Sequence, residues 1–181
     1  KRYKAEKLPL FKTFPCPVVA NIAGGTEEEY EQLTETLNGC DEIWGLEVNL
    51  SCPNVCHGLA FGTDPREVEK LTNRLRRRTA KPLVVKLTPN VTDIAQIAMA
   101  AEACGADAVS CINTVAAMAV DIFSRRSKLA NIVGGLSGPA IKPIALRCTY
   151  EVVRAVKCPV IGIGGITNAT DALEFLLLGA R

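Results

Sequence analysis

Short apolar segments alternate with longer amphipathic segments along most of the chain. The apolar segments are rich in β-branched residues, which is typical of buried strands. They cover residues 17–23, 43–48, 82–86, 108–112 and 159–163. Helical periodicity follows each of them, over segments beginning near residues 26, 65, 91, 142 and 169, the last three ending near 104, 156 and 178. The pattern therefore predicts five β-α units, with a longer irregular stretch between residues 113 and 141.

Local signals support these helix starts. Thr26 can cap a helix with Glu29 at the capping-box position, and Gly24 and Gly25 end the strand before it. Asp64-Pro65 marks another start, because proline is favoured in the first helical turn.

Strands that are apolar on both faces predict a parallel sheet covered by helices. An open doubly wound sheet and a TIM barrel both satisfy this. Polar or glycine residues lie at the carboxyl end of each predicted strand, at Asn21, residues 49–54, Lys86, Asn113-Thr114 and Gly164-Gly165. Strand ends share one face in a barrel, whereas an open sheet gathers its site at one switch point. The fold class is therefore expected to be an α/β TIM barrel.

A complete barrel has eight strands, and this sequence predicts five. We therefore expect residues 1–181 to be an incomplete slice of a single barrel domain in a larger protein. Two or more strands would precede residue 1 and one would follow residue 181. The slice alone would leave two open sheet edges.

Composition excludes several function classes. The chain is 48% hydrophobic with a net charge of +2, so neither nucleic acid nor an anionic membrane is indicated as a partner. The dense basic run, Arg74 and residues 76–78, is expected to be a solvated helix end rather than a phosphate-binding patch. The eight cysteines are scattered, and the sequence contains neither a signal peptide nor a membrane-spanning run. A reducing, cytoplasmic setting follows.

Candidate chemistry lies in the segment Asn-Leu-Ser-Cys-Pro-Asn, residues 49–54. It places two carboxamides, a hydroxyl and a thiol on one loop, although a polar turn with an incidental cysteine has the same composition. Lys86 ends an otherwise apolar strand. A charge in such a strand is usually paired or bound to an electron-rich group, although a lysine side chain can also extend its ammonium group to solvent. Residues 134–138 and 162–165 are glycine-rich. Their backbone amides could approach a phosphate closely, or the glycines could simply form turns. Together they predict a phosphate-bearing cofactor over the strand ends.

The chain resembles class 1 dihydroorotate dehydrogenase, most closely its NAD-linked (class 1B) catalytic subunit. The motifs are VNLSCPN at 48–54, AFGTDP at 60–65, KLTPNVTD at 86–93, INT at 112–114, LAN at 129–131, GGLSGPAIKP at 134–143 and GIGG at 162–165. They occur in order over nearly the whole chain.

The resemblance implies an activity. Such enzymes oxidise (S)-dihydroorotate to orotate in de novo pyrimidine biosynthesis, and they use flavin mononucleotide (FMN) as the acceptor of the C6 hydride. Cys52 would be the base that removes the C5 proton, which requires a thiol pKa below the free value of about 8.5. Electrons would pass to NAD through an iron-sulfur flavoprotein subunit that carries FAD and a [2Fe-2S] cluster. The expected assembly is a homodimer at the core of a heterotetramer.

The resemblance also assigns the remaining site residues. Asn49, Asn54, Asn113 and Thr114 would bind the substrate. Asn21, Asn49, Lys86 and Ile112 would line the flavin, and the ribityl phosphate would lie on backbone groups of Gly138, Gly164 and Gly165. Lys86 would stabilise negative charge on the reduced isoalloxazine.

Several alternatives stay open. Dihydropyrimidine dehydrogenase shares a similar LTPNVTD segment and a reactive cysteine loop, and a fumarate-dependent class 1A enzyme is a further candidate. An inactive flavin-binding barrel or a truncated barrel would not be an enzyme. The sequence departs from the subgroup at residues 55–59 and at Ala116-Ala117. Cys52, Cys56 and His57 lack the second ligand set of a structural zinc site, so no metal is expected, and a reversible disulfide between the two thiols is a hypothesis.

Overall fold

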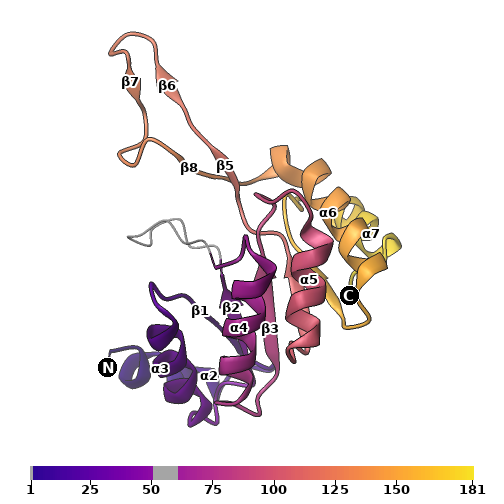
Figure 1. Cartoon of the computed structure of the whole chain (residues 1–181). Coiled ribbons are helices and arrows are strands. Elements are labelled where there is room, and N and C mark those ends of the chain that lie inside the picture. The colour runs from indigo at the N-terminus through magenta and orange to yellow at the C-terminus, as the bar shows by residue number, and fades with distance from the viewer. Residues whose placement is uncertain (1, 51–60) are drawn as a thin grey trace.

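A five-stranded parallel sheet forms the centre of the computed structural model, which describes residues 2–50 and 61–181 (Figure 1). Its strands are β1 (Val19–Ile22), β2 (Gly45–Asn49), β3 (Leu83–Leu87), β4 (Ala108–Cys111) and β9 (Val160–Gly162). They pair in the order β1-β2-β3-β4-β9, which follows the chain. A doubly wound sheet reverses its order at a switch point, and these five strands show no reversal. Their order is that of consecutive strands in an α/β barrel.

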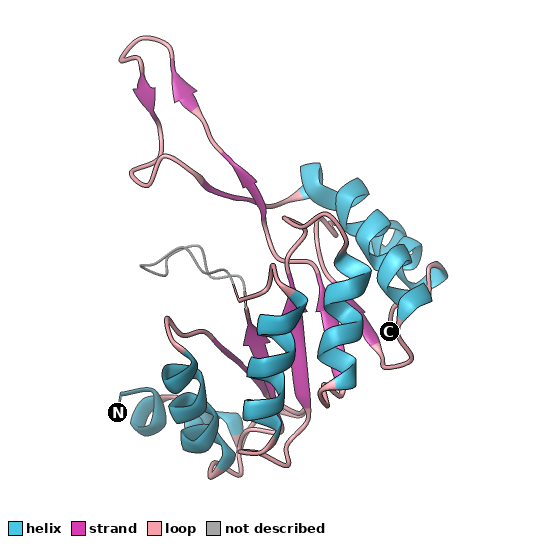
Figure 2. Ribbon diagram, viewed as in Figure 1, coloured by secondary structure: helices cyan, strands magenta, loops and turns pink. Residues whose placement is uncertain are grey.

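Helices connect the parallel strands. They are α3 (Glu27–Asn38), α4 (Pro65–Arg76), α5 (Ile94–Ala103), α6 (Lys142–Ala155) and α7 (Ala169–Leu177), with α1 (Arg2–Glu6) and α2 (Leu8–Phe11) before the sheet and the 3-10 turn η1 (Pro139–Ile141) before α6. Figure 2 shows α4 and α5 side by side over the sheet. The five predicted β-α units are thus confirmed.

The predicted helix starts are confirmed at Thr26 and Asp64, whose side chains cap α3 and α4. One predicted boundary is wrong. The helix expected from residue 91 begins at Ile94, because the Asp93 carboxylate accepts hydrogen bonds from the backbone N–H groups of Ala95 and Gln96. An aspartate in this position fixes the start of the helix.

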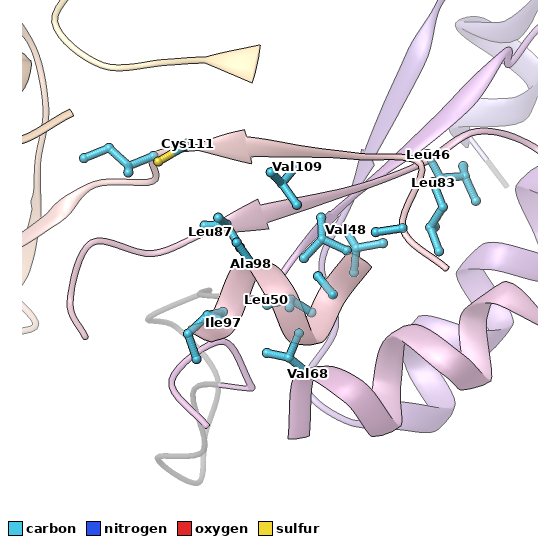
Figure 3. Close-up of a cluster of buried hydrophobic side chains, with 14 of the residues drawn as sticks. Leu46, Val48, Leu50, Val68, Leu83, Leu87, Ile97, Ala98, Val109 and Cys111 are labelled. Atoms are coloured by element: carbon cyan, nitrogen blue, oxygen red, sulfur yellow. The ribbon is translucent and has the colours of Figure 1, made fainter. Parts of the chain in front are cut away.

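The apolar core lies between the sheet and the helices. Alternate residues of the central strands, such as Leu46, Leu83 and Val109, are fully buried. They lie in one cluster with Val68 of α4 and Ala98 of α5 (Figure 3). Because side chains alternate across a strand, the residues between them project from the opposite face. That face carries polar groups, and it provides part of the candidate site.

The sequence predicted an irregular stretch after β4, and this prediction is wrong. The stretch forms a projecting arm of short paired strands (Figure 2). Strand β5 (Val115–Ala117) pairs with β8 (Gly134–Leu136), and β6 (Val120–Asp121) pairs with β7 (Arg126–Ser127), both antiparallel. Each strand has only two or three residues, too few to show a period of two in the sequence.

The basic run at the end of α4 joins elements rather than facing solvent alone. Arg74 pairs with Glu27 and Glu31 of α3. Arg76 binds Asp107 at 2.8 Å (Nη1 to Oδ2) and also two backbone carbonyls. The prediction of a solvated helix end is therefore confirmed for Arg77 and Arg78, which are exposed. It is wrong for the half-buried Arg74 and Arg76, because acidic residues distant in the sequence meet their guanidinium groups.

Two further properties concern the described residues. No helix among them is long and apolar enough to cross a membrane. Their six cysteines are all free thiols, at Cys16, Cys40, Cys104, Cys111, Cys148 and Cys158.

Candidate functional site

A cavity of about 410 Å³ opens at the carboxyl ends of β3, β4 and β9, beside the start of α6. It is lined by Lys86, Ile112, Asn113, Thr114, Ser137, Gly138, Ile141 and residues 162–166. These residues come from four separate segments of the chain. Parallel strands bring them together, since their carboxyl ends share one edge of the sheet.

Glycines form one wall of this cavity. Gly138, Gly164 and Gly165 have φ values of 86°, 133° and 72°, a region that favours glycine. A Cβ atom on Gly165 would lie 2.8 Å from the backbone nitrogen of Lys142 and 2.9 Å from the carbonyl oxygen of Gly138. The loop after β9 therefore lies directly against the start of α6. Bare backbone next to a helix N-terminus fits a phosphate group.

Lys142 lies at this helix start, but its ammonium group binds elsewhere. Its Nζ donates to Asp171 of α7 at 2.6 Å. The other oxygen of Asp171 accepts from the backbone N–H and the hydroxyl of Thr167, at 2.9 and 2.7 Å. Hydrogen bonds from Lys142 and then Thr167 hold the pKa of Asp171 well below its usual range. This cluster ties the end of the glycine loop, at Thr167, to the start of α6 through Asp171 of α7.

A network of carboxamides joins the strand ends. Asn113 donates to the side-chain oxygen of Asn49 at 2.8 Å, and its own oxygen accepts from the N–H of Thr114. Asn90, after β3, donates to the carbonyl of Thr114 at 3.0 Å and accepts from the N–H of Ala116 at 2.8 Å. The predicted substrate residues Asn49, Asn113 and Thr114 are therefore adjacent and held in place.

A second network lies one step deeper on the same face of the sheet. The Glu47 carboxylate accepts from Asn21 Nδ2 at 2.5 Å and from Ser110 Oγ at 2.6 Å. Lys86 Nζ lies 3.6 Å from Glu47 Oε2, which makes an ion pair. The charge on Lys86 is thus paired inside the sheet face, as expected for a lysine in an apolar strand.

The chain on either side of residues 51–60 is held in place. The hydroxyl of Tyr30 donates to the carbonyl of Asn49 at 2.5 Å, and the N–H of Gly62 donates to the carbonyl of Leu50 at 3.1 Å. The predicted residues Cys52 and Asn54, and the metal and disulfide hypotheses for residues 52–57, lie outside the described residues.

Seven of the predicted residues line the cavity: Lys86, Ile112, Asn113, Thr114, Gly138, Gly164 and Gly165. Asn49 is hydrogen-bonded to the lining residue Asn113. Asn21 does not line this cavity, and it is connected to Lys86 through the Glu47 carboxylate. Sequence reasoning missed Glu47, Ser110 and Asn90. A signal for Glu47 was present, because a carboxylate between Leu46 and Val48 is as unusual in a buried strand as Lys86.

The strand order and the glycine-walled cavity at the strand ends indicate an α/β barrel with a site for a phosphate-bearing cofactor. The family model for dihydroorotate dehydrogenase matches residues 1–181, and the chain belongs to this family. The family has the TIM barrel fold, which confirms the predicted class, and the five-stranded sheet is a slice of it.

The chain is also similar to curated proteins named dihydroorotate dehydrogenase B (NAD(+)), catalytic subunit. It is 55% identical to the protein of Geotalea daltonii and 56% identical to that of Geotalea uraniireducens, each over 176 residues. It is 55% identical over 177 residues to the protein of Pelobacter propionicus. Each alignment covers 97% of this chain and 58% of the relative. The chain thus spans less than two thirds of the length of these relatives.

Proposed function

We propose that the protein containing this chain oxidises (S)-dihydroorotate to orotate, with FMN as its cofactor, in de novo pyrimidine biosynthesis. The observation that carries the proposal is the cavity in which Lys86, Asn113 and Thr114 lie beside the glycine wall. It supplies a cation, carboxamides and bare backbone within one space of about 410 Å³. The names of the relatives support the same activity.

The described residues fit FMN. Gly138, Gly164 and Gly165 would hold the phosphate through backbone groups beside the start of α6. The loop lies close enough to that helix that a Cβ atom on Gly164 or Gly165 would be 2.7 Å from Ala145 Cβ or 2.8 Å from the Lys142 nitrogen. Lys86, Asn21, Asn49 and Ile112 would line the isoalloxazine. FMN, when bound, supplies a hydride acceptor for C6 of the substrate. Lys86 would hold a positive charge where the cofactor gains negative charge.

The substrate would lie against the carboxamide network. Asn49, Asn113 and Thr114 offer donors and acceptors that are already fixed by Asn90 and by one another. Preorganised groups of this kind orient a ring without further ordering cost. Asn54 would join them and Cys52 would remove the C5 proton, both on the strength of the family motif.

The names of the relatives support a partner subunit, because "catalytic subunit" implies one. We propose an iron-sulfur flavoprotein partner carrying FAD and a [2Fe-2S] cluster, with NAD as final acceptor. A homodimer of catalytic subunits would form the core of a heterotetramer in the cytoplasm. Residues 1–181 would be the central part of a single barrel domain.

The test is an anaerobic reduction experiment on the full-length protein, co-expressed with its iron-sulfur partner. We expect dihydroorotate to bleach the flavin absorbance at about pH 8, and Cys52→Ala to slow bleaching by orders of magnitude. Retained flavin content in the variant is the control for folding. Failure of dihydroorotate to bleach the flavin would refute the proposal. Oxidation of reduced flavin by uracil or thymine would instead indicate a dihydropyrimidine dehydrogenase.

A further inference from the structure

We propose that Glu47 is a positioning residue that holds the Lys86 ammonium group at the cofactor cavity. The inference rests on the proposed FMN site and goes beyond it, because it concerns a carboxylate outside the cavity lining. Glu47 lies in the middle of β2, flanked by Leu46 and Val48 of the apolar core.

Three side chains from three other strands converge on this one carboxylate. Ser110 of β4 donates to Oε1, and Asn21 of β1 donates to Oε2. Lys86 of β3 lies 3.6 Å from Oε2. Both oxygens are therefore engaged, and Glu47 has little freedom to change rotamer.

Strand register places this carboxylate directly beneath Lys86. Asn49 is the pairing partner of Lys86 across β2 and β3, and Ser110 is its partner across β3 and β4. Glu47 lies two residues before Asn49, on the same face of the sheet. Lys86 is therefore level with Asn49 and Ser110 across the sheet, and Glu47 lies one step deeper on the same face.

The charges explain why the arrangement is needed. The side chains of Lys86 and Glu47 are only 20% and 17% exposed. A partly buried ammonium group on a flexible stem is strongly favoured near an opposite charge. Within residues 2–50 and 61–181, Glu47 is the ion-pair partner that the structure gives to Lys86. Without it, the Lys86 stem would be free to leave the cavity for solvent.

The test measures FMN affinity by fluorescence titration of the cofactor-stripped full-length protein. We expect Glu47→Ala to weaken FMN binding about tenfold or more, the factor expected for loss of contacts to a charged group. Ser110→Ala removes one support of the carboxylate and should weaken binding less. Glu47→Gln keeps the shape but not the charge and should fall between wild type and Glu47→Ala. Glu35→Ala, which removes an exposed carboxylate paired with Arg78, is the matched control and should leave the affinity unchanged.

A double-mutant cycle separates positioning from general damage. If Glu47 acts through Lys86, then Glu47→Ala should have little further effect in the Lys86→Met protein. Additive effects of the two substitutions on FMN affinity would overturn the inference, as would wild-type affinity in Glu47→Ala. The reduction potential of the bound flavin is the second readout, and its shift should show the same non-additivity. A wild-type protein that binds no FMN would refute the proposed function instead, so the two failures are distinguishable.

Discussion

Replacing Gly165 by alanine should distort the glycine wall of the cavity, because the new methyl group would overlap backbone atoms behind that wall. The residue has φ of 72°, and the new Cβ atom would lie 2.8 Å from the Lys142 nitrogen and 2.9 Å from the Gly138 oxygen. Both are backbone atoms, so neither can move away as a flexible side chain could. The loop after β9 and the start of α6 would have to separate.

Two other glycines provide graded controls. Gly138 has φ of 86°, but its Cβ position has no atom within 4 Å. Gly39 has φ of −80° and also has no atom within 4 Å. Gly138→Ala therefore tests backbone strain without a clash with the protein, and Gly39→Ala tests neither.

The magnitudes follow from these geometries. A left-handed conformation costs an alanine about 1–2 kcal/mol. Steric overlap in packed structure adds about 1–3 kcal/mol. We expect a loss of about 2–5 kcal/mol in the free energy of unfolding for Gly165→Ala. For Gly138→Ala we expect about 1–3 kcal/mol, because φ of 86° with ψ of −169° is a conformation populated almost only by glycine. Gly39→Ala should be neutral or stabilising by up to about 1 kcal/mol, because alanine restricts the unfolded chain.

The assay is chemical denaturation of the cofactor-stripped full-length proteins, followed by FMN titration. Gly165→Ala should also weaken FMN binding at least about tenfold, equivalent to about 1.4 kcal/mol. A Gly165→Ala protein as stable as Gly39→Ala, or with wild-type FMN affinity, would refute the reasoning that the glycine wall is shaped by backbone contact.

Three further substitutions test the core, the glycine loop and the strand end. Leu83→Ala, at a fully buried position in the central strand β3, should cost about 2–5 kcal/mol of unfolding free energy, and a loss below about 0.5 kcal/mol would contradict its place in the core. Asp171 has a pKa depressed in the folded state, so its carboxylate contributes stability above the unfolded pKa of about 3.9, and this contribution is lost as pH falls through the folded value. Asp171→Asn should therefore lower the melting temperature at pH 7 and flatten its fall between about pH 5 and 2; an unchanged acid slope would contradict this. Tyr30→Phe removes the donor to the Asn49 carbonyl and should lower the free energy of unfolding, measured by urea denaturation, by about 0.5–1.5 kcal/mol. An unchanged midpoint would show that this hydrogen bond does not stabilise the protein.

Much of the fold was predictable because its signals are local. The apolar strands are continuous, and capping residues such as Thr26 and Asp64 mark where helices begin. The arm between residues 115 and 136 was not predictable from the sequence, because its strands are too short to show the two-residue period of a strand. The pairing of Arg74 with Glu27 and Glu31 joins residues more than 40 positions apart, and no local pattern reports such contacts.

In the site, too, residues with a local sequence signal were predictable and residues that depend on distant contacts were not. Lys86, Asn113 and the glycines were predicted, since each follows a strand or breaks its pattern. The role of Asn90 depends on the start of the arm, after β4, passing beside the segment that follows β3, where the Asn90 amide meets Thr114 and Ala116. Glu47 stands out in the sequence as a charge in an apolar strand, but its three partners come from the parallel register. Register between distant strands was the information that the sequence did not supply.

The most direct test of the central claim, that the cavity at the strand ends is the cofactor site, is amide hydrogen exchange of the full-length protein with and without FMN. We predict slower exchange on FMN addition in peptides that cover residues 134–145 and 160–169, because the glycine wall and the start of α6 would contact the phosphate. Exchange should not change in peptides covering residues 66–77, which include most of α4, on the outer face of the sheet, opposite the polar groups. FMN binding without protection of the glycine segments, or with protection of the outer face instead, would contradict the account.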